Sequence, residues 1–166
     1  MEFVKKFIKE WLPYVIILIL VLLVKAYIVT PIRVNGPSMN TTLKDGDIMF
    51  LNEIIYRFNN IKRFDIVVVK YDDEYIIKRV IGLPGEEVSY KDNKLYINGK
   101  YVKEDFKHKD TADFESVLVG NNQYFVMGDN RANSLDSRVI GPISKKSIKG
   151  RAKLTIFPFK RFGIKK

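Results

Sequence analysis

An apolar stretch near the N-terminus, residues 11–29, constrains this chain more than any other feature. At about 1.5 Å per residue, a helix of this length reaches roughly 28 Å, close to the hydrocarbon thickness of a bilayer. Its only charge, Lys25, lies near one end, where the long side chain can carry the ammonium to the headgroups. We therefore expect one N-terminal transmembrane helix that begins near Trp11 and has Pro13 in its first turn.

Two other interpretations of this stretch compete with a membrane span. A buried core helix of this length would need a large domain around it. A cleaved signal peptide would need small residues at its cleavage site, and residues 25–28 offer no such pattern. Lysines outnumber acidic residues before the stretch, which keeps the N-terminus in the cytoplasm. We expect a cytoplasmic segment (1–10), an uncleaved anchor (11–29) in the cell membrane and one domain (30–166) on its outer face.

The net charge of +10 raises the question of an anionic partner. The basic residues are spread along the chain and mixed with acidic ones, without a dense cluster beside aromatic strands, so we expect no nucleic-acid partner. Attraction to anionic headgroups explains the excess for a domain held at a membrane, which makes membrane lipid the expected partner. The chain has no cysteine, which excludes disulfides, thiolate metal sites and a cysteine nucleophile.

Beyond the anchor, the patterns are those of short strands, and we expect a mainly β fold built on antiparallel sheet. Apolar and β-branched runs bounded by turn residues predict strands at residues 47–51, 64–71, 75–81, 88–90, 95–97, 100–102, 123–127 and 152–157. Asn98-Gly99 is a strong hairpin signal. Residues 103–119 are weakly patterned and highly charged, so we expect a surface excursion there.

The chain has a single histidine, His108, whose charged neighbours predict a solvated loop. A Ser/His/Asp triad would depend on that residue, and two-histidine metal motifs are impossible. No close-spaced carboxylates indicate a hard-metal site, so we predict neither a metal nor a cofactor. The remaining chemistry is that of a serine with a lysine.

Alternation along residues 76–80 places Lys78 on the face of Ile76 and Val80. If that face is buried, desolvation lowers the pKa of the amine, as a lysine base requires. Ser38 lies in a loop with Gly36 and Pro37 that could present a hydroxyl at a cleft. Taken singly, each feature also fits ordinary structure: a lysine on a solvated face, and a serine in a simple turn.

Four segments, in order, resemble the conserved boxes of bacterial type I signal peptidases, and the match extends from about residue 10 to residue 157. SMNTTL at 38–43 resembles the nucleophile box SMxPTL, and DGDI at 45–48 with FDIVV at 64–68 resembles the Gly-Asp strands that follow. YIIKRVIGLPGE at 75–86 resembles the lysine box, and GDNRANSLDSR at 128–138 resembles the last box, GDNRxxSxDSR.

The resemblance implies a membrane-bound serine endopeptidase that removes signal peptides from exported preproteins. Ser38 would attack the scissile carbonyl, neutral Lys78 would take its proton, and Ser134 would orient the Lys78 amine. Two charge pairs would hold the last box against the lysine strand: Asp136 with Arg138, and Asp129 with Arg79. The substrates would carry small residues at the first and third positions before the cleaved bond. Met39 and the apolar strands around Ile48 and Val80 are candidates for lining the pockets.

The sequence departs from the family pattern at Thr41, where the family has proline, so φ is not fixed in the turn after the nucleophile. Gly36 stands two residues before Ser38, as in Gram-positive members, where other members carry a serine. The predicted oxyanion hole is therefore made of backbone N–H groups, from Ser38 and the Gly36 neighbourhood.

Two alternative functions carry different expectations. A self-cleaving repressor uses the same Ser/Lys chemistry but should begin with a DNA-binding helix pair, where this chain has an apolar stretch. A membrane-tethered β-domain that only binds a partner should lack Ser38 or Lys78, and both are present.

Overall fold

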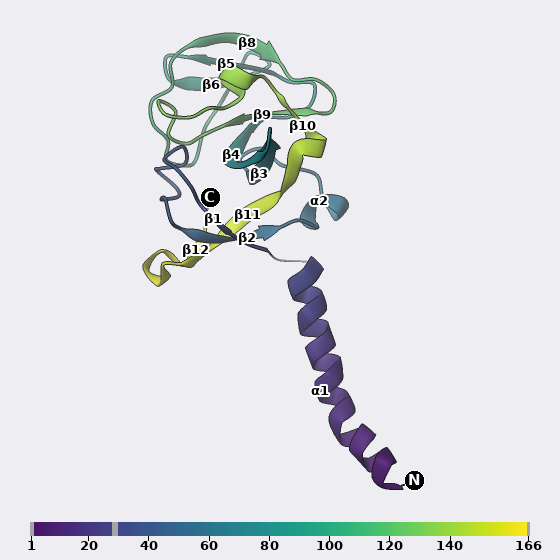
Figure 1. The fold of residues 1–166 in the computed structure, drawn as a ribbon. Coiled ribbons are helices and arrows are strands. Elements are labelled where there is room, and N and C mark those ends of the chain that lie inside the picture. The colour runs from purple at the N-terminus through teal and green to yellow at the C-terminus, as the bar shows by residue number, and fades with distance from the viewer. Residues whose placement is uncertain (1, 28–29, 166) are drawn as a thin grey trace.

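The computed structural model describes residues 2–27 and 30–165, and side chains of the N-terminal helix from residue 6 to residue 22. Helix α1 spans Glu2–Tyr27 and extends away from the rest of the chain (Figure 1). The predicted start at Trp11 is therefore wrong: the helix begins earlier, and Pro13 lies in its interior. The predicted end of the anchor, at Ile28 and Val29, lies outside the described residues.

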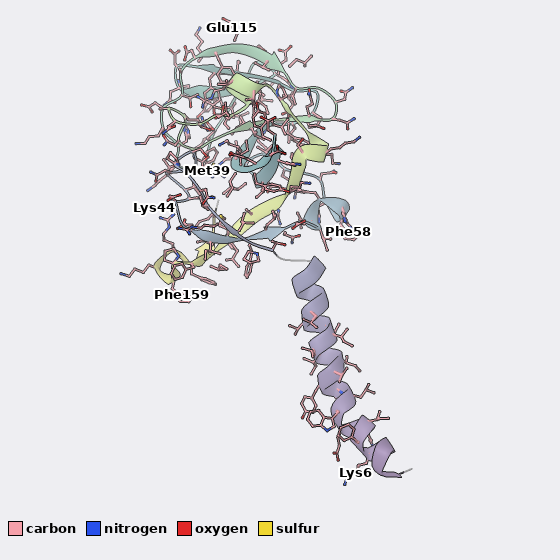
Figure 2. All side chains as sticks on the ribbon, viewed as in Figure 1. Lys6, Met39, Lys44, Phe58, Glu115 and Phe159 are labelled. Atoms are coloured by element: carbon pink, nitrogen blue, oxygen red, sulfur yellow. The ribbon has the colours of Figure 1, made fainter. Side chains whose placement is uncertain are left out.

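The described side chains of α1 are mostly large and apolar, and they are exposed from Phe7 to Leu22. Figure 2 shows them projecting from the helix without β-structure around them. Within the described part of the chain, no helix combines the length and the apolar character that a membrane crossing requires.

The rest of the described chain is mainly β, as predicted. Its elements are β1 (Thr30–Arg33), β2 (Ile48–Asn52), α2 (Ile55–Phe58), β3 (Ile66–Tyr71), β4 (Glu74–Gly82), β5 (Glu87–Lys91), β6 (Lys94–Ile97), β7 (Lys100–Val102), β8 (Phe114–Leu118), β9 (Gln123–Met127), α3 (Ser137–Ile140), β10 (Ile143–Ser144), η1 (Lys145–Ser147), β11 (Ile148–Phe157), η2 (Phe159–Arg161) and β12 (Gly163–Ile164). Each predicted strand overlaps an observed one, whereas the short strands β1, β8, β10 and β12 were not predicted.

The strands form two antiparallel sheets. The larger sheet has the order β1-β2-β11-β3-β4-β9-β10, with β12 paired to β11, and the smaller sheet has the order β7-β6-β5-β8. The smaller sheet lies at the end of the domain farthest from α1 (Figure 1). Strand β4 lies inside the larger sheet, between β3 and β9, so Lys78 and Arg79 on it have a strand on either side.

Three buried apolar clusters hold these sheets together. One lies beneath residues 34–43 and joins Met39 and Leu43 to β2, β3 and β11. A second joins β4 and β9 to the smaller sheet, and a third includes Val67, Val80 and Val126 of β3, β4 and β9. Lys78 lies opposite Val67 of β3, among aliphatic residues of the neighbouring strands. Burial of this apolar surface stabilises the sheet around the lysine.

We call residues 103–111 the strap. They were predicted to form a surface excursion, but part of their side chains face the domain. The strap alternates between exposed and partly buried side chains, and Glu104, Phe106 and His108 are the inward ones. The predicted solvated histidine is also a correction: the His108 side chain is only 15% exposed, and its Nε2 lies 3.3 Å from the Glu104 carboxylate. The alternation was not recognised in the sequence, because two of the inward residues, Glu104 and His108, are polar like the outward ones. Polar side chains can face inward where they find hydrogen-bond partners.

Candidate active site

Ser38 lies in a tight turn between β1 and β2. Gly36 enters the turn with a φ of 82°, a conformation that glycine adopts at little steric cost. After Ser38, the N–H groups of Thr41, Thr42 and Leu43 all point to the Met39 carbonyl oxygen, at 2.8–3.0 Å. Met39 and Leu43 are both 1% exposed, so the turn is anchored in the core on either side of its polar residues. We call residues 36–43 the nucleophile turn.

Lys78 reaches the nucleophile turn from β4. Its side chain is buried, with the residue 3% exposed, which decides between the buried and the solvated face that the alternation left open. The Nζ atom donates a hydrogen bond to the Ser38 Oγ at 2.8 Å. The pKa of Lys78 is lowered to about 8, chiefly by burial; the Asp136 carboxylate opposes this shift, and the Arg138 guanidinium adds to it. A substantial fraction of this amine is therefore neutral near physiological pH.

The segment that follows β9 packs directly on the nucleophile turn. The Asn130 N–H donates to the Ser38 carbonyl oxygen at 2.9 Å, and Asn130 Nδ2 donates to the Pro37 carbonyl oxygen at 3.1 Å. Gly128 allows this approach: a Cβ there would collide with the Ser38 carbonyl and the Ser134 hydroxyl. The last box thus meets the nucleophile turn backbone to backbone.

The predicted charge pairs are both present in the structure. Arg79 Nε and Nη2 donate to the two Asp129 carboxylate oxygens at 2.8 and 2.6 Å, and both side chains are fully buried. The Thr42 hydroxyl donates to Asp129 Oδ2 at 2.6 Å, which connects the pair to the nucleophile turn. The bidentate Arg79–Asp129 pair joins the last box to β4 at the residue next to Lys78.

Asp136 accepts two hydrogen bonds from the Arg138 guanidinium at 2.9 Å and one from the Gly128 N–H at 3.0 Å. Burial alone would raise the pKa of Asp136, but these bonds hold it below its ordinary value. The Ser134 hydroxyl lies between these groups and the nucleophile turn. Its Oγ atom is buried beside Gly128, and its interaction with the Asp136 carboxylate helps to lower the pKa of that group.

The two predicted backbone donors of the oxyanion hole differ in whether their N–H group already makes a hydrogen bond. The Gly36 N–H donates to Asp45 Oδ1 at 2.8 Å, so it is already committed within the turn. None of the described residues accepts a hydrogen bond from the Ser38 N–H. Of the predicted pair, only the Ser38 N–H is open to a developing oxyanion in this structure.

A cleft of about 870 Å³ begins at Ser38 and Lys78. Its walls include Ile32, Leu51, Val68 and Ile77, which give it an apolar floor, and its rim carries charge. The full lining is Thr30, Ile32, Arg33, Asn35, Ser38, Leu51, Glu53, Val68, Glu74, Tyr75, Ile76, Ile77, Lys78 and Lys149. Of the predicted pocket candidates, Met39 does not line it, whereas the strands around Ile48 and Val80 do, through Leu51 of β2 and Ile76 and Ile77 of β4. Met39 and Val80 themselves are buried in the core.

Sequence reasoning also missed a second layer of residues behind the lysine strand. Arg131 is 2% exposed and donates to Tyr90, Thr111 and Glu104 at 2.6–2.7 Å. The Phe106 ring lies 3.9 Å from the Arg79 guanidinium carbon. The alternation of residues 102–108 was the signal that could have placed Glu104 and Phe106 inward.

A serine hydroxyl beside a buried lysine amine, at the end of an open cleft, is the arrangement of serine hydrolases that use lysine in place of histidine. The family described as signal peptidase, peptidase S26, matches residues 8–157 of this chain. Signal peptidase I S of Bacillus subtilis is 42% identical over 170 residues, covering 93% of this chain and 92% of that protein. The chain belongs to the signal peptidase family and is a peptidase.

Further relatives agree. Signal peptidase I of Bacillus licheniformis is 41% identical, with 90% of this chain and 89% of that protein covered. Among solved structures, a signal peptidase I from Enterococcus faecalis matches with a TM-score of 0.51 and 36% identity, covering 56% of this chain and 97% of that one.

Proposed function

We propose that this peptidase is a membrane-anchored endopeptidase that removes N-terminal signal peptides from exported preproteins, with Ser38 as nucleophile and Lys78 as general base. The observation that carries the proposal is the 2.8 Å contact between Lys78 Nζ and Ser38 Oγ, made by an amine whose pKa burial lowers to about 8. The relatives are named signal peptidase I, which supports the choice of substrate.

The catalytic cycle follows from this contact. Neutral Lys78 takes the Ser38 proton as Oγ attacks the scissile carbonyl carbon, and the Ser38 N–H stabilises the resulting oxyanion. Collapse breaks the C–N bond, and the Lys78 ammonium gives its proton to the leaving amine. Lys78 then activates the water that hydrolyses the acyl ester. The buried Ser134 hydroxyl is suited to hold the Lys78 amine, since it lies beside Gly128, where the last box meets the nucleophile turn.

The supporting pairs fix this geometry. Arg79 with Asp129 and Arg138 with Asp136 bind the last box to the lysine strand and to itself. An extended preprotein segment fits the cleft, because an extended chain turns alternate side chains toward one wall. The floor around Ile32, Leu51 and Val68 is apolar, which suits small uncharged side chains before the cleaved bond.

The membrane anchor is the second part of the proposal. Exposed apolar side chains surround α1 from Phe7 to Leu22, and such a sleeve is unfavourable in water. The adjoining rings of Phe7, Trp11 and Tyr14 resemble an interfacial aromatic group. Phe58 and Phe159, each 81% exposed, lie at the end of the domain toward α1 (Figure 2), where lipid could cover them. The N-terminus would face the cytoplasm and the β-domain the outside.

The function is tested on a purified preprotein of known signal peptide. The wild-type chain should release the peptide at a single bond, identified by the masses of both products. Ser38→Ala should show no detectable cleavage, because loss of a serine nucleophile costs about a millionfold. Ser116→Ala, an exposed serine on β8, should cleave as the wild type does. Equal cleavage by the wild type and Ser38→Ala would refute the proposal.

The anchor is tested by alkaline carbonate extraction of vesicles that contain the full chain. We expect the protein to stay with the lipid. A variant with Ile17→Lys and Leu20→Lys should be extracted to a much larger extent, because each lysine costs about 3 kcal/mol at the centre of a membrane helix. Complete extraction of the wild type would contradict the anchor.

A further inference from the structure

The strap is fixed to the domain at points around the candidate active site. Glu104 accepts a hydrogen bond from Arg131 at 2.6 Å, and Phe106 covers the guanidinium of Arg79. At the far end, the Lys109 N–H donates to the Asp129 carbonyl oxygen at 2.9 Å. The strap therefore packs on Arg79 of the lysine strand, on Arg131 and on the segment that touches Ser38.

One further bond joins the strap to the nucleophile turn. The Thr41 hydroxyl donates to the Lys107 carbonyl oxygen at 2.7 Å. Within residues 2–27 and 30–165, it is the only hydrogen bond between these two segments. The turn is thus held at Ser38 by Asn130, at Thr41 by the strap and at Thr42 by Asp129.

Thr41 is also the position at which this chain lacks the proline of the family motif. A proline would fix φ there through its ring, whereas a threonine leaves φ to be set by its contacts. The threonine supplies two hydrogen bonds that a proline cannot make, from its N–H to the Met39 carbonyl and from its hydroxyl to Lys107. The hydrogen bond to the strap can therefore restrain the turn in place of the proline ring.

We propose that Thr41 is a positioning residue: its hydroxyl binds the strap to the nucleophile turn and so keeps the Ser38 Oγ within hydrogen-bond distance of the Lys78 Nζ. The inference rests on the proposed roles of Ser38 and Lys78. Small misplacements of reacting groups lower catalysis steeply, so a looser turn lowers kcat. Thr41 does not line the cleft, so substrate binding should change little.

The test compares Thr41→Val with Thr41→Ser, at a temperature well below the Tm of every variant. Thr41→Val keeps the shape but removes the hydroxyl, and we expect kcat to fall about fivefold, equivalent to about 1 kcal/mol, with KM within about twofold. Thr41→Ser restores the donor and should return kcat to within about twofold of the wild type. Thr155→Val is the matched control: its buried hydroxyl has no partner among the described residues, and kcat should not change.

A double variant tests whether the strap transmits the effect. Phe106→Leu loosens the strap without touching the turn, so its kcat loss and that of Thr41→Val should be less than additive when combined. Wild-type kcat in Thr41→Val, a Thr41→Ser variant as slow as Thr41→Val, a loss confined to KM, or full additivity would each overturn the inference. Failure of the proposed function would appear differently, as cleavage by a chain that lacks the Ser38 hydroxyl.

Discussion

Replacing Lys78 by alanine is expected to lower kcat for signal-peptide cleavage by about a thousandfold, within the range that a general base contributes. The described residues place no other titratable base in hydrogen-bond contact with the Ser38 Oγ, which accepts a hydrogen bond from Lys78 Nζ at 2.8 Å. Without the amine, the hydroxyl would have to lose its proton to water. The measurement is kcat on a short signal-peptide substrate at saturating concentration.

The fold of this variant should persist, because the substitution removes an amine whose burial disfavours its charged form. Lys70→Ala on the neighbouring strand β3 is the matched control, since that lysine is exposed and lies outside the cleft. Its kcat should equal that of the wild type. A Lys78→Ala variant with more than about a tenth of the wild-type kcat would contradict the role of Lys78 as base.

Replacing Arg79 by methionine is expected to lower the free energy of unfolding by about 3–5 kcal/mol, as when one partner of a buried ion pair is removed. Asp129 would keep the Thr42 hydroxyl as a donor but would lose both of its bonds to the guanidinium, while fully buried. The measurement is urea unfolding of the full chain in detergent micelles.

Arg63→Met is the control for this second prediction. Arg63 pairs with Glu86 at 2.6 Å, but both side chains are about one-fifth exposed, so the pair is partly screened by solvent. We expect a loss of no more than about 1 kcal/mol. Equal losses in the two variants would show that burial of the Arg79–Asp129 pair does not set its contribution to stability.

Several parts of the fold and site could be predicted because the sequence signals them locally. β-Branched runs and turn residues predicted the principal strands, and alternation placed Lys78 on the face of its aliphatic neighbours Ile76 and Val80. The pairing of Arg79 with Asp129 and of Asp136 with Arg138 followed from the family boxes. Their catalytic and supporting roles stay predictions until the variants are measured.

The parts that could not be predicted depend on contacts between distant segments. Nothing local to Gly36 signals that Asp45 accepts its N–H, and this contact changes the expected oxyanion hole. Alternation in residues 102–108 could have placed Phe106 inward, but not its contact with Arg79 of β4. The cleft floor is assembled from β1, β2, β3 and β4 together, so single-strand patterns suggested Met39 and Val80 where the sheet instead buries them.

The most direct test of the central claim, that neutral Lys78 activates Ser38, is the pH dependence of kcat. The pKa of Lys78 is lowered from 10.5 to about 8, so the amine is charged and inactive below that pH and neutral above it. We predict that kcat rises about tenfold per pH unit up to a midpoint near 8 and is then constant. A profile that is already flat between pH 6 and 8, or that has a midpoint near 6.5 as for an unperturbed histidine, would contradict the account.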